Sequence, residues 1–133
     1  MTPEAEVLAA LIGRVKELVL SPPMPVLYRE VPGERPEAYI EVDHLPNESD
    51  RVYLAGGPLH RQGILQLTVC QPVGRFEVWH REMAGQVAAH FPPDLRRTSG
   101  TTTVLIYKTD VGRGLPDGGH WRTPVSVHYR VRG

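Results

Sequence analysis

The sequence predicts an α+β fold: a two-layer sandwich with two helices packed on a mostly antiparallel, mixed sheet, in the order α-β-β-β-α-β-β. Residues 62–71 are mostly apolar and are followed by Pro72 and Gly74, which is typical of a central strand. Apolar residues recur at helical spacing over 3–20 and 76–91, and residues 125–131 alternate between apolar and polar side chains. The length of 133 residues favours a single domain over residues 1–133.

The first helix is expected over residues 3–20. Thr2 is suited to cap it, Pro3 fits its first position, and Ser21-Pro22-Pro23 ends it. Its apolar stripe comprises Val7, Leu8, Leu11, Ile12, Val15, Leu18 and Val19.

Strands are expected over residues 25–31 and 38–43, and strands joined by turns are expected to pair antiparallel. A long polar connection follows, over residues 44–61, in which 51–54 has the composition of a short edge strand. Long connections inside a compact domain are usually functional or mobile. The central strand at 62–71 comes next.

The second half of the chain begins with a helix that runs to His90 or Phe91, where Pro92-Pro93 ends it. The charged segment with Asp94, Arg96 and Arg97 is expected to be a solvated connection. Residues 101–107 are β-branched and apolar, which favours a strand. A Gly-rich loop is expected over residues 109–123, before the last strand at 125–131, which has one buried face and one face in water or in contact with a partner.

Composition narrows the function classes. Fifteen basic and fifteen acidic residues give a net charge of zero, so electrostatics provide no general reason to expect nucleic acid or an anionic membrane as partner. A single cysteine, Cys70, excludes an intramolecular disulfide and a cysteine-based zinc cage. Neither a signal peptide nor a membrane-spanning apolar run is found, so we expect folding in a cytoplasm.

The search for chemistry finds no catalytic motif and no cofactor motif. The six histidines lack metalloprotease spacing, although Asp43, His44, His60 and His120 lie in or beside loops from which a metal site can assemble; the alternative is that they are surface histidines with ordinary partners. Cys70 sits within a strand, where a cysteine is far more often a small buried hydrophobe than a nucleophile.

Segments along nearly the whole chain resemble those of phage proteins related to lambda-type tail terminators. The similarity includes the strand Ala38-Tyr39-Ile40-Glu41-Val42, the stretch Arg61-Gln62-Gly63-Ile64-Leu65-Gln66-Leu67-Thr68-Val69 with its Pro72-Val73-Gly74 exit, and the closing Trp121-Arg122-Thr123-Pro124-Val125-Ser126-Val127-His128-Tyr129-Arg130. The second helix matches through Ala84, Val87, Ala88 and Phe91. Arg61-Gln62 stands where the family often has an aromatic residue before the glycine.

The resemblance implies a structural virion protein that caps a tail tube as a ring, usually a hexamer, stops tube polymerisation and presents a head-joining surface. It implies no enzyme activity, cofactor, membrane or sequence-specific nucleic acid. The expected partners are further copies of the chain, the major tail tube protein and the head–tail connector, within the tail of the virion. The alternatives are a head–tail connector or neck protein, and a small α+β enzyme or metal-binding domain that uses the loop histidines.

A ring needs head-to-tail contacts that close. The long connections carry the candidate interface residues, since large apolar side chains in polar loops are either interface anchors or packing on their own domain. The basic residues of the last strand are suited to meet carboxylates of a neighbour, or else form a solvated face. The candidate interface residues are Arg51, Tyr53, Leu54, Arg113, Leu115, Trp121, Arg130 and Arg132.

Overall fold

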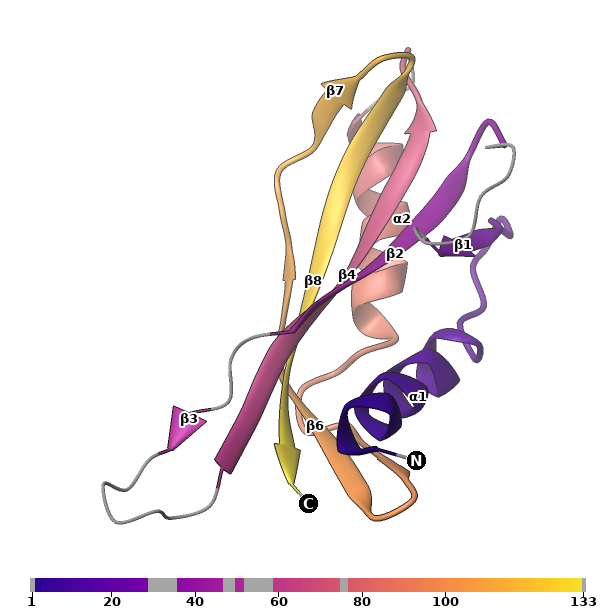
Figure 1. Ribbon diagram of the computed structural model, residues 1–133. Helices are drawn as coiled ribbons and strands as arrows, with labels where there is room; N and C mark the ends of the chain where they lie inside the picture. The colour runs from indigo at the N-terminus through magenta and orange to yellow at the C-terminus, as the bar shows by residue number, and fades with distance from the viewer. Residues whose placement is uncertain (1, 29–35, 47–49, 52–58, 75–76, 133) are drawn as a thin grey trace.

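The computed structural model describes residues 2–28, 36–46, 50–51, 59–74 and 77–132. Its elements are α1 (Pro3–Val15), β1 (Val26–Tyr28), β2 (Tyr39–Pro46), β3 (Asp50–Arg51), β4 (Leu59–Pro72), α2 (Glu77–Ala89), β5 (Arg96–Ser99), β6 (Thr102–Val111), β7 (Leu115–Asp117) and β8 (His120–Arg132) (Figure 1). The predicted α+β class and the order of the two helices and five expected strands are confirmed. The short strands β3, β5 and β7 add to them.

The sheet has the order β1-β2-β4-β8-β6-β5, with β3 paired to β4 and β7 paired to β8. The predicted central strand, β4, indeed lies between β2 and β8. The expectation that neighbouring strands pair antiparallel is wrong for β1 and β2, because Val26 to Tyr28 run parallel to Ile40 to Val42. The stretch between these strands is far longer than a two-residue hairpin turn, so it does not force antiparallel pairing.

The first helix ends five residues earlier than predicted. The Thr2 hydroxyl caps its start, but at its end the Leu18 N–H donates to the Val15 carbonyl at 3.0 Å, an i→i+3 bond that tightens the last turn. Val19 therefore leaves the apolar stripe and is 87% exposed, while Leu20 returns to the core.

Both predicted connections are shorter than expected. In the first, β2 continues to Pro46 and β4 already begins at Leu59. The expected edge strand at 51–54 corresponds in part to β3, and its residues 52–54 lie outside the described residues. The expected loop at 109–123 is wrong, because β6 continues to Val111 and β7 forms a hairpin with β8.

The segment after α2 is not a simple solvated connection. Residues 96–99 form the edge strand β5, which pairs antiparallel with β6. Arg97 also forms an ion pair with Glu17, which follows α1. Within this ion pair, the Arg97 guanidinium donates a hydrogen bond to the Glu17 carboxyl and lowers its pKa below the ordinary value. The strand thus ties the end of α1 to the sheet edge.

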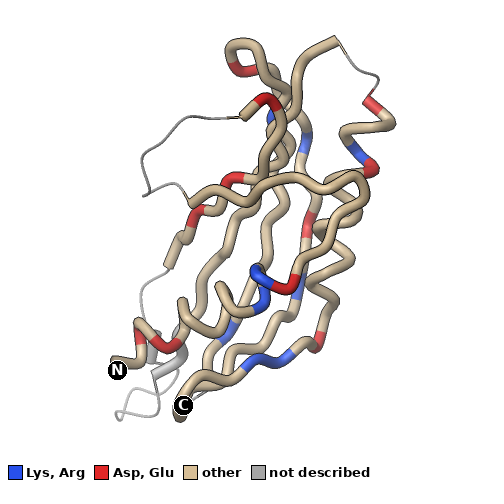
Figure 2. The backbone as a smooth tube through the Cα atoms, turned by 90° about the vertical axis from the view of Figure 1, so that its right-hand side faces the viewer, with Lys and Arg blue, Asp and Glu red and all other residues tan. Residues whose placement is uncertain are grey.

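One apolar core joins both helices to one face of the sheet. Figure 1 shows α2 behind β4 and β8, and Figure 2 shows acidic and basic residues spread along the chain without a block of one sign. Alternate residues of β4 and β8 point into the core, as the pleat requires. The fully buried side chains include Leu11, Ile40, Leu65, Leu67, Val69, Met83, Val87, Phe91, Val125 and Val127.

Gly63 allows a buried tyrosine to reach across the core face. A Cβ atom at this position would lie 2.5 Å from the Tyr129 hydroxyl oxygen, so a larger residue in this strand would displace the ring. The freed space lets the Tyr129 hydroxyl approach His44 Nε2 at 2.5 Å, with the two rings stacked. Tyr129 is 2% exposed, and burial raises its pKa to about 12.

We expect this tyrosine to make stability sensitive to alkaline pH. Its folded-state pKa lies above the value of about 10 in the unfolded chain. Its contribution is therefore complete below about pH 10 and is lost as the pH rises towards about 12. Urea unfolding of the wild type should show a loss of about 1–2 kcal/mol across this window. Tyr129→Phe should show a clearly smaller loss, and equal losses in the two proteins would contradict the assignment.

Candidate assembly interface

The β7–β8 hairpin forms an exposed ridge at one end of the sheet (Figure 1). Asp117 pairs with His120 across the two-residue turn Gly118-Gly119, and Gly118 has a φ of 61°. Such turns need positive φ, which glycine adopts without strain. The turn fixes the register that places Leu115, Pro116 and Asp117 on the surface, all of them exposed.

Pro116 closes the free edge of this ridge to strand addition. It pairs with Trp121, one position away from the Asp117–His120 pair next to the turn. In an antiparallel ladder alternate residues direct their backbone groups outward, and proline has no N–H to offer there. A partner must therefore contact the ridge through side chains rather than by extending the sheet.

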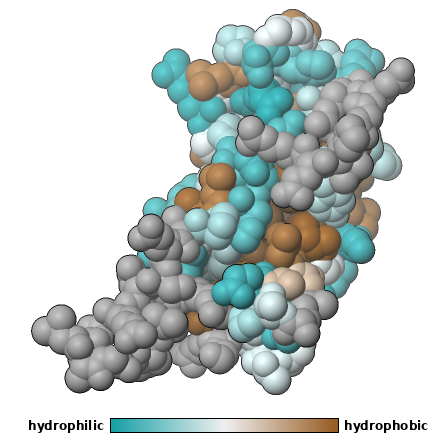
Figure 3. Space-filling model, viewed as in Figure 1, coloured by the Kyte–Doolittle hydropathy of each residue, from teal (hydrophilic) through white to brown (hydrophobic). Residues whose placement is uncertain are grey.

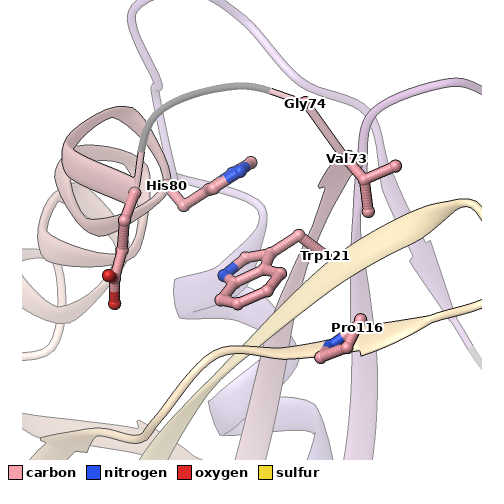
Figure 4. Close-up of a pocket in the computed structure, with 6 residues that line it drawn as sticks. Val73, Gly74, His80, Pro116 and Trp121 are labelled. Carbon is pink, nitrogen blue, oxygen red and sulfur yellow. The ribbon is translucent and has the colours of Figure 1, made fainter.

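On the helix side, the ridge borders a pocket of about 200 Å³ (Figure 4). The indole of Trp121 forms its floor and stacks on the His80 ring from α2, with ring centroids 5.8 Å apart. Gly114 lies close over the indole nitrogen, where any Cβ atom would collide with Nε1. The residues that line the pocket are Val73, Gly74, Glu77, His80, Pro116 and Trp121.

Beneath this pocket lies a cluster of buried polar groups. Oε1 of Gln71 is 2.7 Å from Nδ1 of His80, and both side chains are almost fully buried. Three buried atoms lack a hydrogen-bond partner among the described residues: Gln71 Nε2, Trp121 Nε1 and Thr123 Oγ1. Gln71 and Trp121 are paired across β4 and β8, and Thr123 lies two residues further along β8. An unpaired buried polar atom costs about 1–3 kcal/mol.

On the opposite side of the sheet, the ridge borders a groove of about 390 Å³. Arg122 lies in it between Glu41, at 3.2 Å, and Asp117, at 3.7 Å. Burial on its own lowers the pKa of Arg122, but the Cys70 and Glu41 side chains outweigh it and raise that pKa above its ordinary value. The lining residues are Gln66, Thr68, Arg113, Leu115, Pro116, Asp117, Arg122 and Pro124.

Three of the predicted interface residues meet at this ridge. Arg113 and Leu115 line the groove, Trp121 lines the pocket, and Leu115 is 58% exposed. Arg130 does not join them; its guanidinium lies over the Tyr107 ring, 4.5 Å from the centroid.

The other predicted interface residues are not brought to the ridge. Figure 1 shows β3, which contains Arg51, at the end of the sheet opposite to β7. Arg132 ends β8, far from the turn that β8 shares with β7. Tyr53 and Leu54 lie outside the described residues.

Sequence reasoning missed several residues of the site. Pro116 was part of an expected loop, although a proline two residues before Gly118-Gly119 is compatible with an edge strand at a hairpin. His80 and Gln71 meet through the packing of α2 on β4, which no local pattern reveals. Arg122 continues the alternation of β8 beyond Pro124, and this signal was available in the sequence.

Exposed apolar side chains elsewhere are scattered. Figure 3 shows apolar residues in separate groups among hydrophilic ones on the face it presents. Among the residues whose burial is described, the exposed large hydrophobic ones are Leu8, Val19, Leu45, Val73, Val78, Tyr107 and Leu115. Val73 and Leu115 are the two that line the cavities beside β7.

The structure offers no geometry for the metal and thiol alternatives in the part of the chain it describes. No group of three or more potential metal ligands is found there. His44 contacts Tyr129, His120 packs edge-on against Tyr39, and the side chain of His60 lies outside the described residues. Cys70 is fully buried. No helix among the described residues has the length and apolarity to cross a membrane.

A family model described as phage tail terminator protein matches residues 6–129, nearly the whole chain. The chain belongs to the phage tail terminator family. Membership of this family supports a structural role in the phage tail, with other tail components as partners. No curated protein sequence matches this family member.

A solved structure has the same fold as this tail terminator family member. The two superpose with a TM-score of 0.78 over 96% of this chain and 94% of the other, with 22% sequence identity. At this identity the likeness shows the fold alone.

Proposed function

We propose that this chain, acting as one domain over residues 1–133, caps the end of a phage tail tube as a closed ring of copies, most simply a hexamer. The ring stops tube polymerisation and provides the surface on which the head–tail connector docks. The family match over residues 6–129 is the observation that carries this proposal. Its function is structural and non-catalytic, and assembly takes place in the host cytoplasm.

The ridge supports a self-assembly role. A closed ring is built from contacts between two different patches, one on each neighbour. The pocket beside Trp121 is lined mostly by apolar groups, so it suits an apolar side chain of a neighbouring copy. Pro116 limits this contact to side chains, which favours a closed assembly over an open sheet.

Tail length tests the proposal. A phage that lacks this gene should produce overlong tails without heads, because nothing stops the tube. Electron microscopy of lysates measures the length distribution, and a plasmid copy of the gene should restore the normal length. Finished tails of normal length lying beside full heads would instead identify a head–tail connector.

A further inference from the structure

We infer that the groove on the outer side of β7 binds an extended, carboxylate-bearing segment of a partner protein, with Arg113 as the residue that receives the carboxylate. This inference rests on the proposed function only in that the chain works by contact with other proteins. The groove volume of about 390 Å³ falls within the range of about 300–1,000 Å³ that is typical of ligand sites.

The ion pairs in the groove leave one arginine without a partner among the described residues. Arg122 is already paired with Glu41 and Asp117. Arg113 lines the same groove with an exposed side chain, and it has no hydrogen bond or ion pair within the described part of the chain. A guanidinium accommodates a carboxylate with two parallel hydrogen bonds, which makes a carboxylate the complementary group.

The floor and walls of the groove fit a peptide. Gln66 and Thr68 of β4 provide an amide and a hydroxyl that make no side-chain hydrogen bond to other described residues. Leu115, Pro116 and Pro124 form an apolar wall. A segment with alternating aliphatic and acidic side chains fits the apolar wall on one side and Arg113 on the other, because successive side chains of an extended chain point to opposite sides.

Nucleic acid fits this groove less well. Binding to phosphates draws on several cations together, whereas here Arg122 is paired with Glu41 and Asp117, and Arg113 is the unpaired cation among the described residues that line the groove. Their carboxylates would repel a phosphodiester backbone. A carboxylate opposite Arg113 brings one negative charge towards Glu41 and Asp117, whereas a nucleic-acid strand brings one at every nucleotide.

Nuclear magnetic resonance titration of the full chain tests the inference with two synthetic probes: acetyl-Leu-Asp-Leu-Asp-amide and its Leu-Asn-Leu-Asn counterpart. The acidic peptide should shift the backbone amides of Thr68, Arg113 and Leu115, with a Kd in the millimolar range or below. The neutral peptide should bind at least about fivefold more weakly, because it lacks the charge-assisted hydrogen bonds.

Two arginine variants provide the control. Arg113→Gln should weaken the acidic peptide by at least about fivefold, while Arg130→Gln, which removes a guanidinium that already lies over Tyr107, should leave the affinity unchanged. Absence of shifts in the groove, equal affinity for the two peptides, or full affinity in Arg113→Gln would overturn the inference. Tighter binding of a short oligothymidylate at the same amides would also overturn it, in favour of nucleic acid.

These titrations need neither a ring nor a tail. If the peptide does not bind but the gene still controls tail length, the groove assignment alone is wrong. If the gene deletion produces no overlong tails, the proposed function is wrong. The peptide titration is unaffected by that outcome.

Discussion

Replacing Val73 with Asp should abolish ring assembly while the fold remains intact. Val73 is 49% exposed at the rim of the pocket beside Trp121, so the isolated chain loses little buried apolar area. In the proposed ring we expect the same position to be desolvated, where an unpaired carboxylate is costly. Hot-spot residues of interfaces cost at least about 2 kcal/mol when they are lost, and we expect a loss of this size per contact, which is a change of about thirtyfold in each contact's dissociation constant.

Val19→Asp is the matched control for that experiment. Val19 is also an exposed valine, at 87%, but it follows α1 and lines neither cavity beside β7. Sedimentation velocity over a range of concentrations measures the mass of each protein, and circular dichroism checks the fold. Assembly of Val73→Asp like the wild type, or equal loss of assembly in Val19→Asp, would contradict the assignment of the pocket to the ring contact.

Truncating Phe91 to Ala should produce the largest loss of stability of any substitution considered. Phe91 is fully buried, stacks edge-on against His90, and its carbonyl accepts a hydrogen bond from Thr109 Oγ1 at 2.7 Å. It fills the core where α2 ends and the chain turns towards β5. Phe→Ala substitutions in cores cost about 3–5 kcal/mol, through lost transfer free energy and the cavity left behind. Since whole domains are stable by about 5–15 kcal/mol, the variant should be near its unfolding limit.

Urea denaturation measures this loss, and Phe91→Leu is its control. The leucine keeps most of the apolar volume, so its cost should be about 1–2 kcal/mol and well below that of alanine. A loss under about 1 kcal/mol in Phe91→Ala would show that the core at the end of α2 collapses around the cavity or is less tightly packed than described.

Much of the fold follows from periodicity in the sequence. The apolar residues at 62–71 and the alternation at 125–131 predicted β4 and β8, the two strands at the centre of the sheet, because local patterning decides which face of a strand is buried. The end of α1 was missed because the apolar stripe continues through Val19, while the backbone turns earlier. The parallel pairing of β1 was missed because strand direction depends on where the connection returns, which side-chain patterns do not encode.

The candidate site was predictable only in part. Leu115 and Trp121 stood out as large apolar residues in a polar stretch, and the hairpin brings them to one ridge. The cavities on its two sides arise from the packing of α2 on β4 and β8, and from the position of Arg122 between two carboxylates. Such contacts join residues that are distant in sequence, so no spacing rule reveals them.

Electron microscopy of purified protein mixed with tail tubes of the same phage shows whether the protein caps the tube ends. With a gold label on the protein, we expect a ring of copies at one end of each tube, and no further growth of those tubes when tube subunits are added. Label along the whole tube, label that is absent from the ends, or labelled tubes that continue to grow would contradict it.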